Sequence, residues 1–403
     1  MAPVDAASSL EFAKFAVGQP VPRSEDPKLL RGRGRYTDDV NLPGQAHAWI
    51  LRSPHAHGTI RKLDVAAARA MPGVLAVWTA KDLEAFGYGT IKCMPVGTNR
   101  DGTPMRLPAR PALSGDKVRF VGDPVAIVIA ETRDQARDAA EAIELDVATL
   151  PAVTSARAAL APGAPEIFAD VPGNLQFDYH FGDAAKVAEA FKRAAHVTRR
   201  DLIISRVIVS AMEPRSAVIG YDAASARWTV HIGCQGVFGM RNNLAEIMKV
   251  PPEQIRVLAE SVGGSFGMKA AVYPEYISLL HAARALGRPV KWTEERGQSF
   301  LSDQAGRDHE VVGELALDAQ GSFLALRITA IGNLGAYLSS YAPMIPGLGL
   351  VKNSIGVYRT PLIEVATRCA ITNTSAIGAY RGAGRPEGNY IMERLVDAAA
   401  TEM

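Results

Sequence analysis

The sequence contains few cysteines, and they form no recognisable site. Three occur among the 403 residues, far apart at Cys93, Cys234 and Cys369. Because no pair has a metal-binding spacing and no histidine cluster accompanies them, the sequence predicts no local zinc or iron–sulfur site. A low and odd count also provides no disulfide framework, so we expect a reducing, cytoplasmic location.

The sequence also lacks a strong net charge and a long apolar run. Its formal net charge of +2 gives no global attraction to nucleic acid or to an anionic membrane. No stretch approaches the roughly 18 apolar residues of a spanning helix, and residues 1–20 lack the apolar core of a signal peptide. The basic run 31–35 could bind RNA, but it has no interleaved aromatic residues, which favours a solvated or structural role.

The composition that is present predicts a folded chain of two or three domains. Apolar residues make up 48% and charged residues 21%, which is enough for a substantial core. We divide the chain into a first block at 18–150, a linker rich in proline, alanine and glycine at 151–173, and a second block at 174–403. Periodicity predicts a strand at 125–130, a hairpin at 314–327, and helices at 133–143, 237–249, 274–286 and from residue 386.

Three loops of small or polar residues precede three of these helices. The first loop is 233–236 (GCQG), the second is 263–269 (GGSFGMK) and the third is 378–385 (GAYRGAGR). Glycine lets backbone N–H groups approach a ligand closely, and a helix N-terminus favours negative charge. Together the loops indicate a site for a large anionic ligand, although a tight turn remains the alternative for any one of them. None matches a common nucleotide-binding motif.

The exact residue order of these loops is more informative than their composition. The second loop and AYRGAGRPE at 379–387 resemble two signature loops of the xanthine oxidase-type molybdenum hydroxylases, especially the large subunits similar to carbon monoxide dehydrogenase. RGRYTDD at 33–39, RSPHAH at 52–57 and VGDPVA at 121–126 resemble the opening domain of that family. The resemblance implies an α+β fold, with an a/b hammerhead domain at 18–150 and the first mixed α/β half of the molybdopterin-binding region at 174–403.

The resemblance also implies cofactors and partners. Such enzymes carry molybdenum on molybdopterin, in bacteria often as the cytosine dinucleotide, and oxidise an electron-poor carbon with oxygen derived from water. Electrons then pass to [2Fe–2S] clusters and to FAD, usually on a small and a medium partner subunit. We therefore expect a component of an oxidoreductase complex that acts on a small molecule, an aldehyde or an N-heteroaromatic ring.

The resemblance assigns seven cofactor-binding residues: Gln235, Gly236, Gly264, Phe266, Gly267, Arg381 and Gly382. Gln235, Phe266 and Arg381 are expected near the molybdenum without being thiolate ligands. The alternatives are a polar residue at a helix start for Gln235, a core side chain for Phe266 and a structural salt bridge for Arg381.

Three positions depart from the purine-oxidising relatives and are expected to line the substrate pocket. Ala270, Gly349 and Ala383 stand where those relatives use a glutamate, an arginine and a phenylalanine, so xanthine is a poor candidate. Gly382 stands where the CO-oxidising branch has its copper-binding cysteine, and without a thiolate a soft copper ion loses its ligand.

No catalytic residue is assigned within 1–403, because the family's late Gly-x-Gly-Glu segment with its general base has no match there. We expect a second molybdopterin-binding chain to supply that glutamate, and we expect this chain alone to be inactive. A non-catalytic or truncated cofactor-binding scaffold fragment is the alternative. Other conspicuous groups are read as structural: hydrogen bonding for His55 and His57, architecture for Glu213–Arg215, and surface or ion-pair roles for Glu275 and Glu294.

Overall fold

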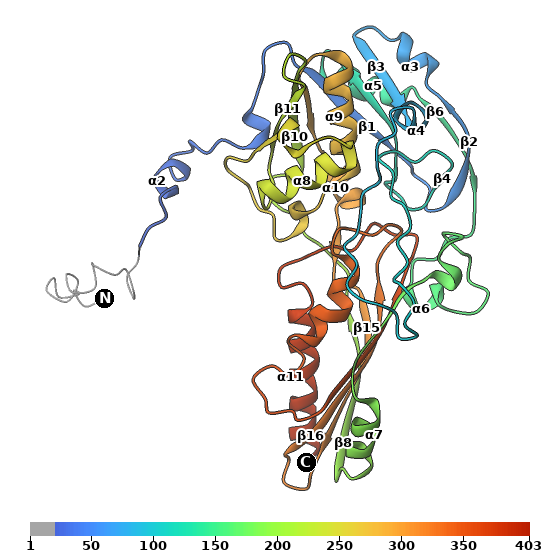
Figure 1. Ribbon diagram of the computed structural model, residues 1–403, viewed down its shortest axis with the longest axis vertical. Helices are drawn as coiled ribbons and strands as arrows, with labels where there is room; N and C mark the ends of the chain where they lie inside the picture. The colour runs from blue at the N-terminus through green and yellow to red at the C-terminus, as the bar shows by residue number, and fades with distance from the viewer. Residues whose placement is uncertain (1–20) are drawn as a thin grey trace, which may run out of the picture.

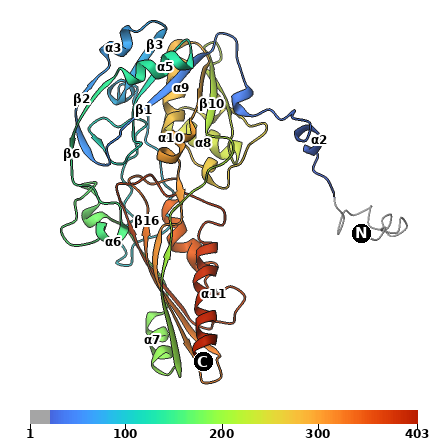
Figure 2. The same ribbon diagram turned by 180° about the vertical axis from the view of Figure 1, so that it is seen from behind.

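Four sheets organise residues 21–403, the part of the chain that the computed structural model describes. Seven- and three-stranded sheets form the upper part of the molecule in Figure 1, and a long five-stranded sheet forms the lower part. The segment around α2 (Asp26–Leu29) stands apart from this body in both ribbon views (Figures 1 and 2). The expectation about a signal peptide concerns residues 1–20, which lie outside the described residues.

The seven-stranded sheet combines both blocks of the sequence. β1 pairs in parallel with β13, with Ala46 opposite Val290, so strands from the first block continue the sheet of the second. Because one sheet contains strands of both blocks, it does not mark where one domain ends, and the domain boundaries stay a prediction. In sheet order the strands are β12 (Ile255–Leu258), β11 (Arg227–Ile232), β10 (Ser216–Asp222), β13 (Val290–Thr293), β1 (Ala46–Arg52), β5 (Pro124–Ala130) and β3 (Val74–Thr79). A neighbouring three-stranded sheet has the order β4 (Lys117–Val118), β2 (Gly58–Asp64), β6 (Glu144–Thr149).

The strand expected at 125–130 is confirmed as β5, whose seven residues are all buried. Alternate side chains enter different cores. Ile127 and Ile129 belong to one cluster, whereas Val128 packs in another with alanines of α5 (Arg133–Glu141). A continuous apolar run is what a strand covered on both faces requires. α5 confirms the next expected helix, and Thr132 caps it by accepting a hydrogen bond from the Gln135 N–H.

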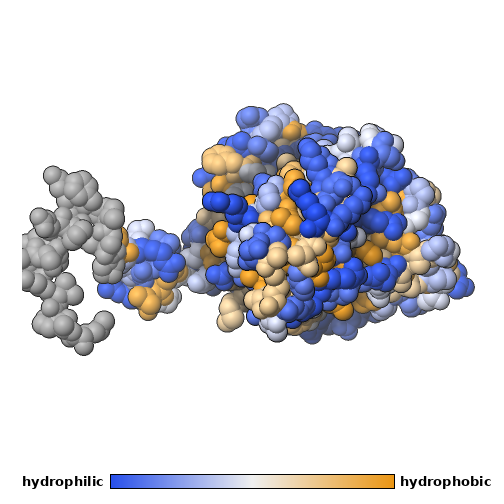
Figure 3. All heavy atoms as spheres, turned by 90° about the horizontal axis from the view of Figure 1, so that it is seen from below, coloured by the Kyte–Doolittle hydropathy of each residue, from blue (hydrophilic) through white to orange (hydrophobic). Residues whose placement is uncertain are grey.

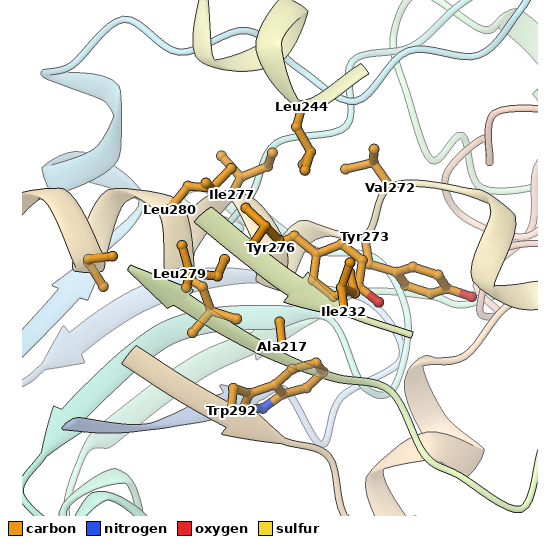
Figure 4. Packing of buried hydrophobic residues seen from close by; sticks show 14 of the residues in the cluster. Ala217, Ile232, Leu244, Val272, Tyr273, Tyr276, Ile277, Leu279, Leu280 and Trp292 are labelled. Atoms are coloured by element: carbon orange, nitrogen blue, oxygen red, sulfur yellow. The ribbon is translucent and has the colours of Figure 1, made fainter. Parts of the chain in front are cut away.

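Helix α9 (Pro274–Leu286) covers one face of the seven-stranded sheet and confirms the helix expected at 274–286. In Figure 4, Tyr276 and Leu279 of α9 lie over Ala217 and Trp292 of the sheet. Proline at its first turn and Gly287 in a left-handed C-cap, with φ of +62°, explain where it begins and ends. The sheet and α9 thus form a rigid support for the loops at their ends.

The five-stranded sheet lies between two helices. α11 (Arg385–Glu402) runs along one face and α7 (Ala184–Lys192) covers the other (Figures 1 and 2). The predicted hairpin is confirmed by β15 and β16, joined by a turn in which the Gly321 N–H donates to the Asp318 carbonyl. The strand order is β7 (Leu175–Gly182), β17 (Ile363–Ala370), β16 (Phe323–Asn333), β15 (His309–Leu317), β8 (His196–Ile204).

Shorter elements complete the described chain. The segment expected as a linker contains α6 (Ala156–Ala159), and Ile167 and Val171 are buried in a core cluster beside it. None of the helices within residues 21–403 has the length and apolar character needed to cross a bilayer. The remaining α-helices and strands are α3 (Ala66–Ala70), α4 (Ala80–Glu84), α8 (Val237–Met248), α10 (Arg296–Ser302), β9 (Val207–Ile208) and β14 (Ala305–Gly306).

Candidate functional site

The fold brings the three glycine-rich loops together. The first loop follows β11 and the second follows β12, and because these strands are parallel neighbours, their carboxyl ends meet at one edge of the sheet. The third loop comes from the other sheet, after β17, and ends at the start of α11. Direct hydrogen bonds join the first loop to the second and the second to the third.

Gln235 joins the first loop to the second. Its Oε1 accepts hydrogen bonds from the Ser265 hydroxyl at 2.7 Å and from the Gly267 N–H at 2.9 Å. Because a backbone N–H can only donate, the amide oxygen must face it, and Nε2 faces elsewhere. Nε2 donates to no acceptor among residues 21–403 and the side chain is exposed. The N-cap of α8 is Gly236, so Gln235 directly precedes the helix start, and its role beside a cofactor stays a prediction.

The second loop has a conformation that exposes backbone donors. Gly264, Phe266 and Gly267 have φ of +103°, +50° and +104°. The consecutive N–H groups of Gly264, Ser265 and Phe266 donate to no acceptor within the described part of the chain. Such unpaired, neighbouring N–H groups suit an anionic or carbonyl-rich ligand. Phe266 is 45% exposed, so the alternative of a core side chain is wrong.

The third loop contacts the second through its backbone. The Arg381 N–H donates to the Phe266 carbonyl at 2.9 Å, and a Cβ on Gly267 would lie 2.3 Å from the Ala379 carbonyl oxygen. The Arg381 guanidinium is exposed and has no hydrogen bond or ion pair among residues 21–403, so the salt-bridge alternative finds no support there. Gly382, with φ of +103°, turns the chain tightly against Pro386.

Two of the three expected pocket residues lie against each other. Gly349 ends a π-helical turn, Ile345–Gly349, and a Cβ there would lie 2.5 Å from the Ala383 carbonyl oxygen. Any larger side chain at position 349 would therefore need the third loop to move. Ala270 ends the short helix Met268–Ala270, which begins within the second loop. Their roles in a substrate pocket stay a prediction.

A buried ion pair connects the second loop to Glu213, outside the loop. Nζ of Lys269 lies 2.8 Å from Oε2 of Glu213, which also accepts a hydrogen bond from the Gly263 N–H. Oε1 of Glu213 accepts from the Thr37 N–H at 3.2 Å, which ties the loop to the first block. Burial lowers the pKa of Lys269, while the hydrogen bond and charge of Glu213 oppose that shift. Glu213 is thus fully engaged by the protein.

A larger ionic cluster lies deeper in the body. We call it the buried ionic cluster: Arg52, Arg215, Glu275, Glu294 and Asp303. All five side chains are at most 5% exposed, so the surface alternative for the two glutamates is wrong and the ion-pair reading is confirmed. The architectural reading of Arg215 is also confirmed, since it donates to all three carboxylates and stacks on Tyr273.

Two further polar groups are only partly engaged by the protein, since Nε2 of His57 and Oε2 of Glu387 are buried without a hydrogen-bond partner among residues 21–403. Nδ1 of His57 lies 2.8 Å from the Pro151 carbonyl, which confirms its structural hydrogen bonding. Glu387, at the start of α11, accepts a hydrogen bond from Arg307, a residue that sequence reasoning missed and no sequence signal indicates. Within residues 21–403 no group of three or more histidine, cysteine, aspartate or glutamate side chains has a metal-binding arrangement.

Comparison with known families matches almost the whole described chain. Residues 31–151 match the family described as "Aldehyde oxidase and xanthine dehydrogenase, a/b hammerhead domain". Residues 167–403 match the family described as "Molybdopterin cofactor-binding domain". The two matches agree with the fold class expected from the sequence.

Similar proteins are oxidoreductase subunits. The carbon monoxide dehydrogenase large chain of Hydrogenophaga pseudoflava is 32% identical over 100% of this chain and 50% of its own length. The nicotine 6-hydroxylase large subunit of Paenarthrobacter nicotinovorans is 33% identical over 97% and 47%, respectively. The crystal structure of quinoline 2-oxidoreductase from Pseudomonas putida 86 has a TM-score of 0.89 at 34% identity, covering 96% of this chain and 48% of its own. The chain thus spans about half the length of the curated relatives it matches.

Proposed function

The chain belongs to the molybdopterin cofactor-binding family of the xanthine dehydrogenase and aldehyde oxidase type, and from this premise we propose that it is the molybdenum-cofactor-binding component of a hydroxylase or dehydrogenase. The observation that carries the proposal is the junction of the three loops through Gln235, Phe266 and Arg381. The unpaired donors of that junction support cofactor binding, which the cofactor-binding scaffold alternative shares, so the two proposals differ in turnover.

The donors of the loops fit the proposed group. Molybdopterin carries phosphate and carbonyl oxygens, and the loops offer the Gln235 amide Nε2, three consecutive N–H groups at 264–266 and the Arg381 guanidinium. No aspartate or glutamate occurs in any of the three loops, so nothing in them repels an anion. Arginine suits phosphate and other oxygens because its planar fork can donate two hydrogen bonds at once.

Each side chain has a distinct proposed role. Gln235 would donate to an oxygen ligand of the metal, Phe266 would cover one side of it, and Arg381 would balance negative charge. Gly236 and Gly264 would let the backbone approach the cofactor without steric conflict, and Gly267 and Gly382 would shape the second and third loops around it through their close contacts with Ala379 and Pro386. When bound, the group supplies the metal-centred oxidation chemistry, and the protein supplies orientation and charge.

The proposed substrate is an aldehyde or an N-heteroaromatic ring. Ala270, Gly349 and Ala383 are small, and they provide none of the side chains that the purine-oxidising relatives place at these positions. Two proteins similar to this chain are named for nicotine and quinoline, both of which are N-heteroaromatic compounds.

The proposed assembly includes other chains. We place the general-base glutamate on a second molybdopterin-binding chain, since Glu213 and Glu387 near the loops are already paired. Exposed apolar side chains at Met212 (91%) and Phe238 (70%), close in sequence to Glu213 and the first loop, suit a protein contact. A [2Fe–2S] small subunit and an FAD-binding medium subunit would receive the electrons. The cytosine dinucleotide form of the cofactor is part of the proposal.

The location of this assembly is proposed to be the cytoplasm. All three cysteines are buried free thiols, and burial raises the pKa of Cys93 to about 12, which keeps it unreactive.

The experiment that tests the function is co-purification of the complex from cells that make it, with metal analysis and extraction of the pterin. We expect about one molybdenum per copy of this chain, together with flavin and iron. A complex that assembles fully but holds no molybdenum would contradict the proposal, and a loaded complex that oxidises neither aldehydes nor N-heteroaromatic rings would favour the scaffold alternative.

Two variants locate the site. Gln235→Ala and Arg381→Ala should each lower molybdenum occupancy or turnover at least several-fold. Gln320→Ala, in the β15–β16 turn, and Arg256→Ala, at an exposed position of β12, are matched controls outside the loops and should retain both. Equal occupancy and turnover in all four variants would overturn the site assignment.

A further inference from the structure

Arg307 lies in a short, strongly turned segment between β14 and β15. Its φ is +68° and that of Asp308 is +71°, a conformation that needs support from its surroundings. Oδ2 of Asp308 accepts hydrogen bonds from Arg206 Nη1 and Asn333 Nδ2, both at 3.0 Å. The Asn333 N–H also donates to the Asp308 carbonyl at 3.0 Å. These contacts fix the turn and direct the Arg307 side chain at the third loop.

The Arg307 guanidinium makes four contacts there. Nη1 donates to the Tyr380 carbonyl at 3.2 Å and to Oε1 of Glu387 at 3.1 Å, and Nη2 donates to the Arg381 carbonyl at 2.9 Å. The guanidinium also stacks on the Tyr380 ring, with its carbon 4.8 Å from the ring centre. Its side chain is 14% exposed and that of Glu387 is fully buried, so water screens the pair little.

These contacts leave Arg381 with little backbone freedom. Its N–H is bound to the Phe266 carbonyl and its carbonyl is bound to Arg307. The peptide groups on both sides of Arg381 are therefore anchored, one by the second loop and the other by Arg307. The guanidinium of Arg381, in contrast, has no partner among residues 21–403 and is free to bind a ligand.

We propose that Arg307 is a positioning residue, which holds the third loop so that Arg381 faces the bound cofactor. The inference rests on the proposed function, because it requires a cofactor beside Arg381. This positioning requires an arginine, because its planar guanidinium can donate to two adjacent carbonyls and a carboxylate while it stacks on an aromatic ring. A lysine ammonium could keep the ion pair with Glu387, but it could not retain the fork or the stacking.

The test compares Arg307→Lys and Arg307→Met with Arg327→Lys in the complete complex. Arg327 is a matched control, because its guanidinium stacks on Phe191 at 4.0 Å and pairs with Glu314 and Glu364, away from the loops. We expect molybdenum and pterin content to fall at least several-fold in both Arg307 variants, with faster hydrogen exchange at 379–384. Arg327→Lys should retain the wild-type molybdenum and pterin content, even if its melting temperature falls as much as those of the Arg307 variants.

The outcomes separate this inference from the proposed function. If the wild-type complex holds no molybdenum, the proposed function fails. If the wild-type complex is loaded and both Arg307 variants are as fully loaded as Arg327→Lys, the positioning role is wrong. If Arg307→Lys is fully loaded and only Arg307→Met is depleted, positive charge alone suffices, and the positioning role is again wrong.

Discussion

Nη2 of Arg52 lies 2.6 Å from Oε1 of Glu275, and both side chains are at most 5% exposed. Arg52 ends β1, in the segment that matches the hammerhead family, whereas Glu275 lies in the first turn of α9, in the segment that matches the molybdopterin-binding family. The pair belongs to the buried ionic cluster, in which two arginines face three carboxylates. Charge as well as sheet pairing therefore joins the two parts of the chain.

Removing one member of this pair should destabilise the fold strongly. Arg52→Met leaves Glu275 and Glu294 with a single buried arginine, and we expect a loss of about 3–5 kcal/mol in the free energy of unfolding. The control is Arg288→Met, which breaks the partly exposed pair with Glu131 and should cost at most about 1 kcal/mol. Urea denaturation measures the free energy of unfolding of both variants. Equal losses would show that the buried pair stabilises the fold no more than the partly exposed pair does.

Glu294 should make stability depend on pH. Burial raises the pKa of Glu294 to about 7 from an ordinary value of 4.5, and the negative charges of Asp303 and Glu275 add to this shift while Arg215 and Arg52 oppose it. A raised pKa stabilises the folded state below pH 4.5, and this contribution is lost as the pH rises through 7. Arg215 and Arg52 keep the pKa of Glu275 low, so Glu275 stays ionised across that range.

Glu294→Gln isolates this effect, because glutamine stays neutral at every pH. Relative to the variant, the wild type should lose on the order of 1–3 kcal/mol of stability between pH 5 and pH 8. Urea midpoints of both proteins at each pH provide the measurement. Parallel curves for the two proteins would mean that Glu294 does not hold the extra proton.

Gly267→Ala should separate the second loop from the third. The added methyl group would lie 2.3 Å from the Ala379 carbonyl oxygen, and φ of +104° is strained for alanine. Gly321→Ala is the control for the backbone term alone, since its φ is +81° and nothing lies within 4 Å of the new Cβ. Each should cost about 1–3 kcal/mol through φ. Only Gly267→Ala should also deplete molybdenum from the complex, and equal metal content in both would contradict the contact.

Much of the secondary structure could be predicted because its signals are local. The apolar run of β5 and the proline and glycine at the ends of α9 act over a few residues, and both elements formed as expected. The three loops were also visible, since their glycines and polar residues precede helices. The three loops were identified by their own residues and by their place before a helix, without any knowledge of long-range contacts.

The support of the loops could not be predicted from the sequence. Arg307 reaches Arg381 across 74 positions, and Glu213 reaches Lys269 across 56. The parallel pairing of β1 with β13 joins residues more than two hundred positions apart. Such pairings depend on how sheets assemble, and neither periodicity nor turn chemistry specifies a partner at that distance.

Carbon monoxide should not be a substrate, despite the 32% identity with a carbon monoxide dehydrogenase large chain. The family resemblance implies that Gly382 occupies the position of the copper-binding cysteine of that branch, and glycine offers no thiolate. Its φ of +103° disfavours any other residue, and a Cβ there would lie 2.4 Å from the ring of Pro386, so Gly382→Cys should also fail to create the activity. The measurement is the rate of CO oxidation by the complete complex, compared with its best organic substrate. The proposed pocket has no thiolate to bind copper. If CO were oxidised as fast as the best organic substrate, another copper ligand would be required in the pocket, and this prediction would be contradicted.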